Sequence, residues 1–211
     1  MDEAEAYRIL KAKLGNREWR LDNLYWIQDE KGHEVKFVRN EAQRAYWRDL
    51  WYRNVIVKGR QLGFSTFIAL LDLDGCLFDS NTSAGLIDLT LPDGTKKLDK
   101  IRFAYERLPR AVKDALPLVK NNGREMRFSN GSSITAGLSH RGGTLQVLHV
   151  SEMGEIAADR PERAAEIITG GFGAVHSGSM IHVESTAKGR AGYFYKMVEA
   201  AQALQKEKRP L

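Results

Sequence analysis

A basic, glycine-containing segment that follows a short apolar run has the composition of a phosphate-binding loop. The run is Val55-Ile56-Val57, and Lys58-Gly59-Arg60-Gln61-Leu62-Gly63-Phe64-Ser65-Thr66 follows it. A strand, a loop and a helix N-terminus in this order point backbone N–H groups at a bound polyanion. Against the usual pattern G-x-x-x-x-G-K-[ST], only Gly63 and Ser65 match over residues 58–65. Taken alone, the segment leaves two readings open, a phosphate loop and a tight strand–helix turn with a basic loop.

A second polar pair follows another apolar run. Residues 145–150 are apolar enough for a central strand, and Ser151 and Glu152 stand directly after it. Ligands of parallel α/β sheets bind at the carboxyl ends of the strands, so this pair would lie near a bound phosphate. A surface acid at a strand end is the plain alternative for Glu152. It is weakened because this strand follows the loop in the order that a phosphate-loop ATPase requires.

The departures from the usual loop pattern are themselves recognisable. Lys58, Arg60, Gly63, Phe64 and Ser65 resemble the form K-x-R-x-x-G-[FY]-S, in which the lysine stands at the front. This form is found in a group of large terminase subunits of tailed bacteriophages. A Ser-Glu pair at the end of the acidic strand also occurs in that group. The chain therefore resembles the N-terminal ATPase domain of a large terminase.

The resemblance implies a site for ATP and Mg²⁺. Lys58 and Arg60 would neutralise phosphate charge, and Glu152 would polarise the attacking water. Ser65 would ligate Mg²⁺ from the first turn of the helix. Ser151 stands where the standard ending has Asp, and it would hold a water of the metal shell. Residues 58–66 together would bind the nucleotide.

Three further segments are similar to terminase motifs and occur in the same order. Gln43 stands where such proteins read adenine, because an amide can pair with the N6/N7 edge of that base. A lone glutamine on a helix is more often simply solvated. Arg141 corresponds to an arginine finger, with a solvated loop arginine as an alternative of equal weight. Ser185 and Thr186 resemble the coupling motif, which relays loss of the γ-phosphate to DNA movement.

The resemblance covers roughly residues 24–200 and implies a motor that hydrolyses ATP to drive double-stranded DNA into a procapsid. Such a motor works as a ring docked on the portal protein in the host cytoplasm, with the small terminase subunit as a partner; a monomer is the alternative for the isolated domain. No acidic cluster of a nuclease domain precedes Leu211, so we expect no nuclease activity. Two alternatives stay open, a helicase-like ATPase and a catalytically inactive nucleotide- or DNA-binding module.

The remaining pattern predicts an α/β fold of the phosphate-loop NTPase (ASCE) type, with a mostly parallel central sheet flanked by helices. The expected helices are residues 3–14, 40–53, 65–78, 97–107, 110–119, 161–169 and 193–206. The expected strands are residues 24–28, 33–38, 55–57, 84–91, 125–128, 133–136, 145–150 and 180–183. We expect residues 1–211 to form a single ATPase domain, with a helix and hairpin lid region in residues 1–40 and the phosphate-loop core in residues 41–211.

Composition sets wider limits on function. The longest apolar stretch near the centre, residues 64–71, is too short to span a bilayer, so we expect no membrane partner. The net charge of +5 permits a polyanion partner without demonstrating one. Residues 102–127 hold seven basic and three acidic side chains, which suits a DNA or subunit contact, although a solvated face is more common. Cys76 has apolar neighbours, which favours a buried structural thiol.

Overall fold

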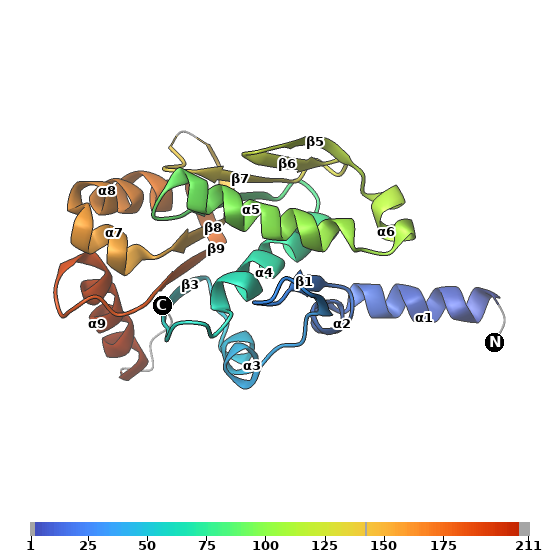
Figure 1. Cartoon of the computed structure of the whole chain (residues 1–211), viewed down its shortest axis with the longest axis horizontal. Coiled ribbons are helices and arrows are strands. Elements are labelled where there is room, and N and C mark those ends of the chain that lie inside the picture. The colour runs from blue at the N-terminus through green and yellow to red at the C-terminus, as the bar shows by residue number, and fades with distance from the viewer. Residues whose placement is uncertain (1–2, 142, 207–211) are drawn as a thin grey trace.

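The computed structural model describes residues 3–141 and 143–206 (Figure 1). Its α-helices are α1 (Glu3–Gly15), α2 (Arg17–Asn23), α3 (Glu41–Arg48), α4 (Phe64–Phe78), α5 (Leu91–Glu106), α6 (Arg110–Ala115), α7 (Met153–Asp159), α8 (Pro161–Glu166) and α9 (Gly192–Lys206). A π-helical turn (Ile167–Gly171) and a 3₁₀ turn (Phe172–Ala174) follow α8. The strands are β1 (Trp26–Gln28), β2 (Glu34–Lys36), β3 (Arg53–Val57), β4 (Ser83–Ile87), β5 (Leu118–Asn122), β6 (Glu125–Phe128), β7 (Ser133–Gly137), β8 (Leu145–Ser151) and β9 (Val175–Ser185).

Seven strands form the central sheet, in the order β3-β9-β8-β4-β7-β6-β5. The first five run parallel, whereas β6 and β5 are antiparallel to their neighbours. Parallel neighbours need crossover connections, and here helices supply most of them and cover both faces of the sheet. This confirms the predicted mostly parallel sheet flanked by helices.

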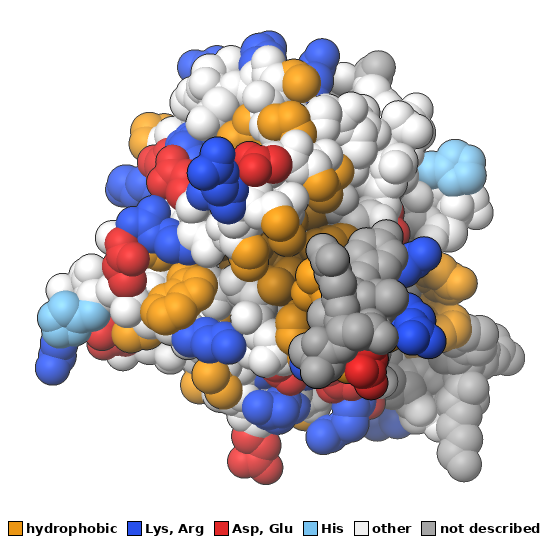
Figure 2. Space-filling model, turned by 90° about the vertical axis from the view of Figure 1, so that its right-hand side faces the viewer, with side chains coloured by type: hydrophobic (Ala, Val, Ile, Leu, Met, Phe, Trp, Pro, Cys, Tyr) orange, Lys and Arg blue, Asp and Glu red, His pale blue; other side chains and the backbone are white. Residues whose placement is uncertain are grey.

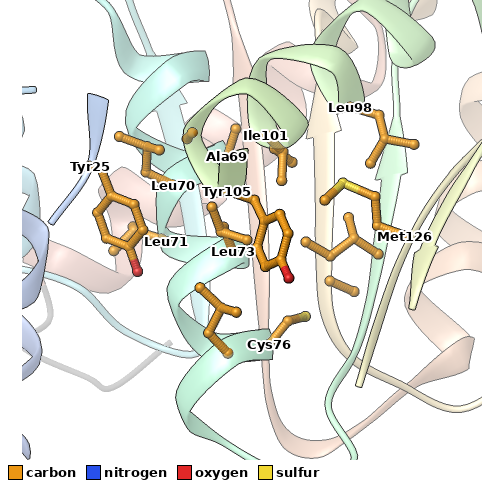
Figure 3. Packing of buried hydrophobic residues seen from close by; sticks show 14 of the residues in the cluster. Tyr25, Ala69, Leu70, Leu71, Leu73, Cys76, Leu98, Ile101, Tyr105 and Met126 are labelled. Atoms are coloured by element: carbon orange, nitrogen blue, oxygen red, sulfur yellow. The ribbon is translucent and has the colours of Figure 1, made fainter. Parts of the chain in front are cut away.

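Residues 58–63, which we call the phosphate loop after their predicted role, lead into α4. This helix is apolar on nearly all sides, which makes it a buried core helix. Twelve of its 15 residues are buried. Figure 3 shows Leu70, Leu73 and Cys76 of α4 among Ile101 and Tyr105 of α5. Full burial of an apolar side chain of this size stabilises a fold by about 1.5–3 kcal/mol. The packing therefore fixes α4, and with it the position of its N-terminus.

A buried carboxylate ties the N-terminal segment to α4. Asp74 accepts two hydrogen bonds from Arg20, at 2.9 and 2.7 Å, and one from the Tyr25 hydroxyl at 2.7 Å. Arg17 lies 3.1 Å from the same carboxylate. A buried charge requires such partners, since an unpaired one would be strongly destabilising. These contacts hold α2 and the start of the β1–β2 hairpin against the core.

The structure differs from the predicted elements at several boundaries. The strand predicted over 84–91 ends at Ile87, because Thr90 caps α5 by accepting a hydrogen bond from the Asp93 N–H. The helix predicted over 110–119 ends at Ala115, and Pro117 separates it from β5. The helix predicted over residues 40–53 is shorter in the structure, where α3 begins at Glu41 and ends at Arg48. Helices α2 and α7 and strand β5 were not predicted.

Most basic side chains of residues 102–127 have acidic partners. The ion pairs are Arg102–Asp99, Arg107–Glu34, Arg110–Asp114, Lys120–Glu125 and Arg127–Glu125. Figure 2, a view of the molecule from the end where α1 lies, likewise shows Lys and Arg interspersed with Asp and Glu. In residues 3–141 and 143–206, no helix has the length and apolar character needed to cross a membrane.

Candidate functional site

The loop after β3 presents the N-terminus of α4. Gly63 caps this helix with φ 68°, in the left-handed region that glycine adopts without steric strain. The first hydrogen bond inside the helix runs from Phe67 N to Gly63 O at 3.0 Å. The N–H groups of Phe64, Ser65 and Thr66 are therefore not used within the helix. Together with the helix dipole, they favour an anion at this end.

Phe64 stands where the usual loop pattern has lysine, and its side chain is buried. It packs with Ile56 of β3 and Ile68 of α4, and its ring meets the Tyr46 ring edge-on at 5.9 Å. The aromatic ring thus anchors the loop to the core, while the backbone N–H of Phe64 belongs to the helix N-terminus. Positive charge at this end of the helix comes instead from Lys58, whose ammonium lies 2.8 Å from Ser65 Oγ.

The sheet order brings the acidic strand to the same edge as the loop. Because β9 lies between β3 and β8, the ends of all three parallel strands are adjacent. The Lys58 N–H donates to the Ser185 carbonyl at 3.0 Å, which joins the loop to the end of β9. Glu152, directly after β8, has φ 56° and ψ 36°. Strained left-handed residues of this kind concentrate at functional sites.

The side chain of Lys58 contacts three other residues of the site. Its ammonium lies 2.8 Å from Ser65 Oγ, 3.2 Å from Glu152 Oε1 and 2.6 Å from Glu184 Oε2. Burial alone would lower the pKa of Lys58, but the charges of Glu184 and Glu152 outweigh it and raise the pKa. The ammonium therefore stays charged at neutral pH. The sequence predicted that Lys58, Ser65 and Glu152 would share a site, and the structure brings them together.

Glu184 is the buried counter-charge of this site. Its carboxylate accepts a hydrogen bond from Ser151 Oγ at 2.8 Å and lies 3.2 Å from His149 Nε2. The Lys97 ammonium lies 3.7 Å from it and 2.9 Å from Asp88. Burial would raise the pKa of Glu184, but the His149 hydrogen bond and the charges of His149 and Lys97 hold it well below its ordinary value.

The polar cluster continues beneath the site into the core. His149 Nδ1 lies 3.4 Å from Asp72 of α4, and the two rings of His149 and His182 are 6.4 Å apart. Burial would lower the pKa of His149, but its contacts with Asp72 and Glu184 raise it. Burial and the nearby His149 lower the pKa of His182 to about 3, so this ring is neutral. A chain of ionisable groups thus runs from the phosphate loop into α4.

The segment resembling the coupling motif lies between the loop and α7. Ser185 is fully buried, and its hydroxyl has no hydrogen-bond partner in the described part of the chain. A Cβ at Gly154 of α7 would lie 2.8 Å from Ser185 Oγ and 2.9 Å from the Thr186 carbonyl, so only glycine allows this approach. A shift at the end of β9 would therefore act directly on α7 through this contact.

Gln43 supports the phosphate loop in this structure. Its amide nitrogen donates to the Gly63 carbonyl at 3.0 Å, and its amide oxygen accepts from the Asn40 N–H at 3.0 Å. The second bond completes a capping box at the start of α3. With both ends of the amide engaged and only 3% of the residue exposed, reading adenine would require at least one of these bonds to break. The adenine role of Gln43 stays a prediction.

The two arginines predicted to act in the site lie outside its centre. Arg60 is exposed at the tip of the loop, next to Gln61, whose φ is 61°. Arg141 lies 3.2 Å from Glu166 of α8, and 59% of its side chain is exposed. Its side chain runs close over Gly170, where a Cβ would come within 2.8 Å. A role in phosphate transfer stays a prediction for both.

A cavity of about 650 Å³ opens beside the loop. Its walls are the phosphate loop, the β1–β2 hairpin and one side of α5. The lining residues are Ile27, Gln28, Asp29, Glu30, Gly32, Lys58, Gln61, Leu62, Gly63, Phe64, Ser65, Thr66, Lys100 and Phe103. This volume is in the range of pockets that hold cofactor-sized ligands.

Sequence reasoning missed Glu184 and Lys97 as members of the site. Glu184 stands within the segment that resembles the coupling motif, directly before its two hydroxyl residues, Ser185 and Thr186. An acid in an apolar strand was the available signal, because a buried carboxylate needs cationic partners. Lys97 gave no such signal, since one lysine on an amphipathic helix is usually solvated.

Strand order, loop and acid together define the fold of a phosphate-loop NTPase of the ASCE type. Comparison with solved structures narrows this to the fold of phage large-terminase ATPase domains. The HK97 bacteriophage large terminase matches 92% of this chain with a TM-score of 0.68 and 11% identity, and the chain spans 42% of that protein. The ATPase domain of the Thermus phage P74-26 large terminase matches 81% of this chain and 73% of its own length, with a TM-score of 0.53 and 18% identity. No family model matches the chain. No curated protein matches it in sequence.

Proposed function

We propose that this chain is the ATP-hydrolysing motor domain of a phage large terminase, and that it couples hydrolysis to translocation of double-stranded DNA into the procapsid. The observation that carries the proposal is the meeting of loop and acidic strand at one ammonium. Lys58 contacts Ser65 at 2.8 Å and Glu152 at 3.2 Å, although 94 positions separate Lys58 from Glu152 (152 − 58 = 94). The fold shared with terminase ATPase domains supports the same function.

In this proposal the phosphates bind at the N-terminus of α4. The free N–H groups of Ser65 and Thr66 would hold phosphate oxygens, and Lys58 and Arg60 would neutralise their charge. Glu152 would orient and polarise the attacking water. Its side chain is 32% exposed, so water can reach it. These fixed charges would stabilise the charge that develops on the transferred phosphoryl group.

The oxygen atoms around Lys58 fit Mg²⁺, which prefers hard oxygen ligands. Ser65 would ligate the ion directly. The Ser151 hydroxyl donates its proton to Glu184, which leaves its lone pairs to accept from a metal-bound water. Bound Mg²⁺ would supply charge neutralisation on the phosphate oxygens.

The mechanical part of the proposal concerns the edges of the site. Ser185 and Thr186 would sense the γ-phosphate and pass its loss to α7 through the close contact at Gly154. Arg141 would act on the site of a neighbouring subunit in a ring. The portal protein, the small terminase subunit and double-stranded DNA would be the partners of that ring, which would work on the portal in the host cytoplasm.

Two substitutions test the ATPase proposal. Lys58→Ala should lower both MgATP binding and phosphate release, because it removes the charge that reaches the phosphates. Glu152→Gln should bind MgATP nearly as the parent does, yet lose about 10²- to 10⁴-fold in turnover, the usual contribution of a positioned general base. Lys96→Ala is the matched control, since Lys96 is 75% exposed and pairs with Asp93. Calorimetry and a phosphate-release assay measure the two quantities.

Hydrolysis at the parent rate by Lys58→Ala would refute the assignment of the shifted lysine. Phosphate release stimulated by single-stranded rather than double-stranded DNA would favour the helicase-like ATPase. MgATP binding without any release, alone or with DNA, would favour the inactive module.

A further inference from the structure

The phosphate loop forms only part of the 650 Å³ cavity. The remaining wall comes from the β1–β2 hairpin and α5, which contribute Ile27, Gln28, Lys100 and Phe103. The loop side offers N–H groups and charge, which suit a polyanion. This other side combines an aliphatic side chain, an aromatic ring and an amide. Such a combination suits a flat heteroaromatic ring with a polar edge.

The Phe103 ring is held in place from outside the cavity. The Arg107 guanidinium lies 3.6 Å from the centroid of the ring. Arg107 in turn forms an ion pair with Glu34 of β2, and a second with Glu106. These contacts clamp the hairpin onto α5 and leave the rest of the half-buried ring to line the cavity. A ring fixed in this way loses little conformational freedom when a ligand stacks on it.

Gln28 supplies a polar group to this wall of the cavity. It is the last residue of β1, its side chain is exposed, and within residues 3–141 and 143–206 its amide has no hydrogen-bond partner. The Gln43 amide, by contrast, is engaged at both ends by backbone groups. A free carboxamide presents one donor and one acceptor side by side, the complement of the N6/N7 edge of adenine.

We propose that Phe103 and Gln28 form the nucleobase site of this chain, with the base stacked on the Phe103 ring and its edge read by the Gln28 amide. The inference rests on the proposed ATP site and adds the residues that select the base. It also predicts a preference for adenine over guanine. Guanine carries an oxygen in place of the 6-amino group, so both edge atoms are acceptors, and one amide cannot donate to both while its own oxygen faces them.

The experiment compares three ligands, MgATP, MgGTP and magnesium tripolyphosphate, which has the charge but no base. Phe103→Leu should weaken MgATP binding by about 5- to 100-fold, the loss expected for one base–aromatic stack. Phe103→Trp should keep most of the affinity, because it keeps an aromatic face. Gln28→Ala should bring the affinities for MgATP and MgGTP close together. Lys31→Ala, in the same hairpin but outside the cavity lining, should match the parent throughout.

Tripolyphosphate distinguishes a failure of the nucleobase proposal from a failure of the ATPase proposal on which it rests. Its binding should be equal in the parent, Phe103→Leu and Gln28→Ala, which also shows that the variants are folded. Parent-like MgATP binding by Phe103→Leu, or an unchanged preference for MgATP over MgGTP in Gln28→Ala, would overturn the nucleobase site while leaving the phosphate site intact. Loss of tripolyphosphate binding in Phe103→Leu would show that the ring supports the loop instead. A parent that binds neither MgATP nor tripolyphosphate would refute the ATPase proposal itself.

Discussion

Glutamine at position 184 would show how strongly the buried charges hold the site together. The Glu184 side chain is fully buried and lies 2.6 Å from the ammonium of Lys58 and 3.7 Å from that of Lys97. Both lysine side chains are only 10% exposed. Glutamine keeps the shape and an oxygen that can accept from Ser151, but it removes the negative charge shared by the two ammonium groups. The substitution therefore isolates the charge from the packing.

The expected cost is large because the partners cannot escape to water. Removing one member of a buried ion pair typically destabilises a protein by about 3–5 kcal/mol. For a domain of this size, each kcal/mol lowers Tm by roughly 2–4 °C, so Tm should fall by about 6–20 °C. A loss of this size is a sizeable part of a total stability of about 5–15 kcal/mol.

The effect of Glu184→Gln should depend on pH in a defined direction. The pKa of Glu184 is well below its ordinary value of 4.5 in the folded chain, so the unfolded chain binds more protons between the two values. The contribution of the carboxylate to stability is therefore complete above the unfolded pKa and declines as the pH falls toward the folded pKa. The difference between parent and variant should therefore narrow as the pH falls below about 4.5. It should also decline as the pH rises through the raised pKa of His149, because the carboxylate of Glu184 helps to raise that pKa.

Urea unfolding followed by circular dichroism measures this difference. Glu166→Gln is the matched control, because it removes the same charge from an exposed pair whose side chains, Arg141 and Glu166, are 59% and 38% exposed. Such a pair contributes about 0–1 kcal/mol. If Glu184→Gln costs no more than Glu166→Gln at neutral pH, the buried cluster does not stabilise the fold and the reasoning is wrong.

Two further predictions concern single side chains. Cys76 is fully buried, and its burial raises the pKa of its thiol. A thiol reagent should therefore modify the folded chain more slowly than the urea-unfolded chain, by roughly two orders of magnitude or more. Absorbance measures the two rates, and equal rates would contradict the burial. Arg141→Ala and Glu152→Gln, each inactive, should regain ATP hydrolysis when mixed under conditions where subunits assemble, because a finger of this type supplies about 10³-fold or more in rate. An assembled mixture that stays inactive would place Arg141 in its own subunit or in support of the loop.

The centre of the site could be predicted from sequence because few topologies are compatible with it. An apolar β-branched run before Lys58 and a second apolar run before Glu152 had to become parallel strands, and their carboxyl ends had to share an edge. The buried role of Phe64 could have been inferred from its apolar character alone. Glu184 could not be placed, because its partners depend on β9 entering the sheet between β3 and β8. That pairing joins residues more than a hundred positions apart.

The position of Arg141 depends on the register of the sheet as well as on sequence order. Arg141 lies in the connection from β7 to the acidic strand β8. The register shows that β7 ends at Gly137, level with Ile87 at the carboxyl end of β4. Strand β8 begins at Leu145, near the amino ends of the parallel strands. The connection must therefore run back across β4, and a Cβ at Gly85 would lie 2.9 Å from the His140 ring in that connection. This return path carries Arg141 toward α8.

The contacts of Lys58 explain how an anion at the loop can affect the rest of the molecule. The same ammonium serves Glu184 at 2.6 Å and faces the helix N-terminus where an anion would bind. An anion that attracts Lys58 weakens its hold on Glu184, and the carboxylate is then balanced by Lys97 of α5 and His149 of β8. His149 also contacts Asp72 of α4. Because these groups are buried, water cannot compensate for the lost charge, so a phosphate that arrives or leaves must change forces on α4, α5 and the end of β9 together.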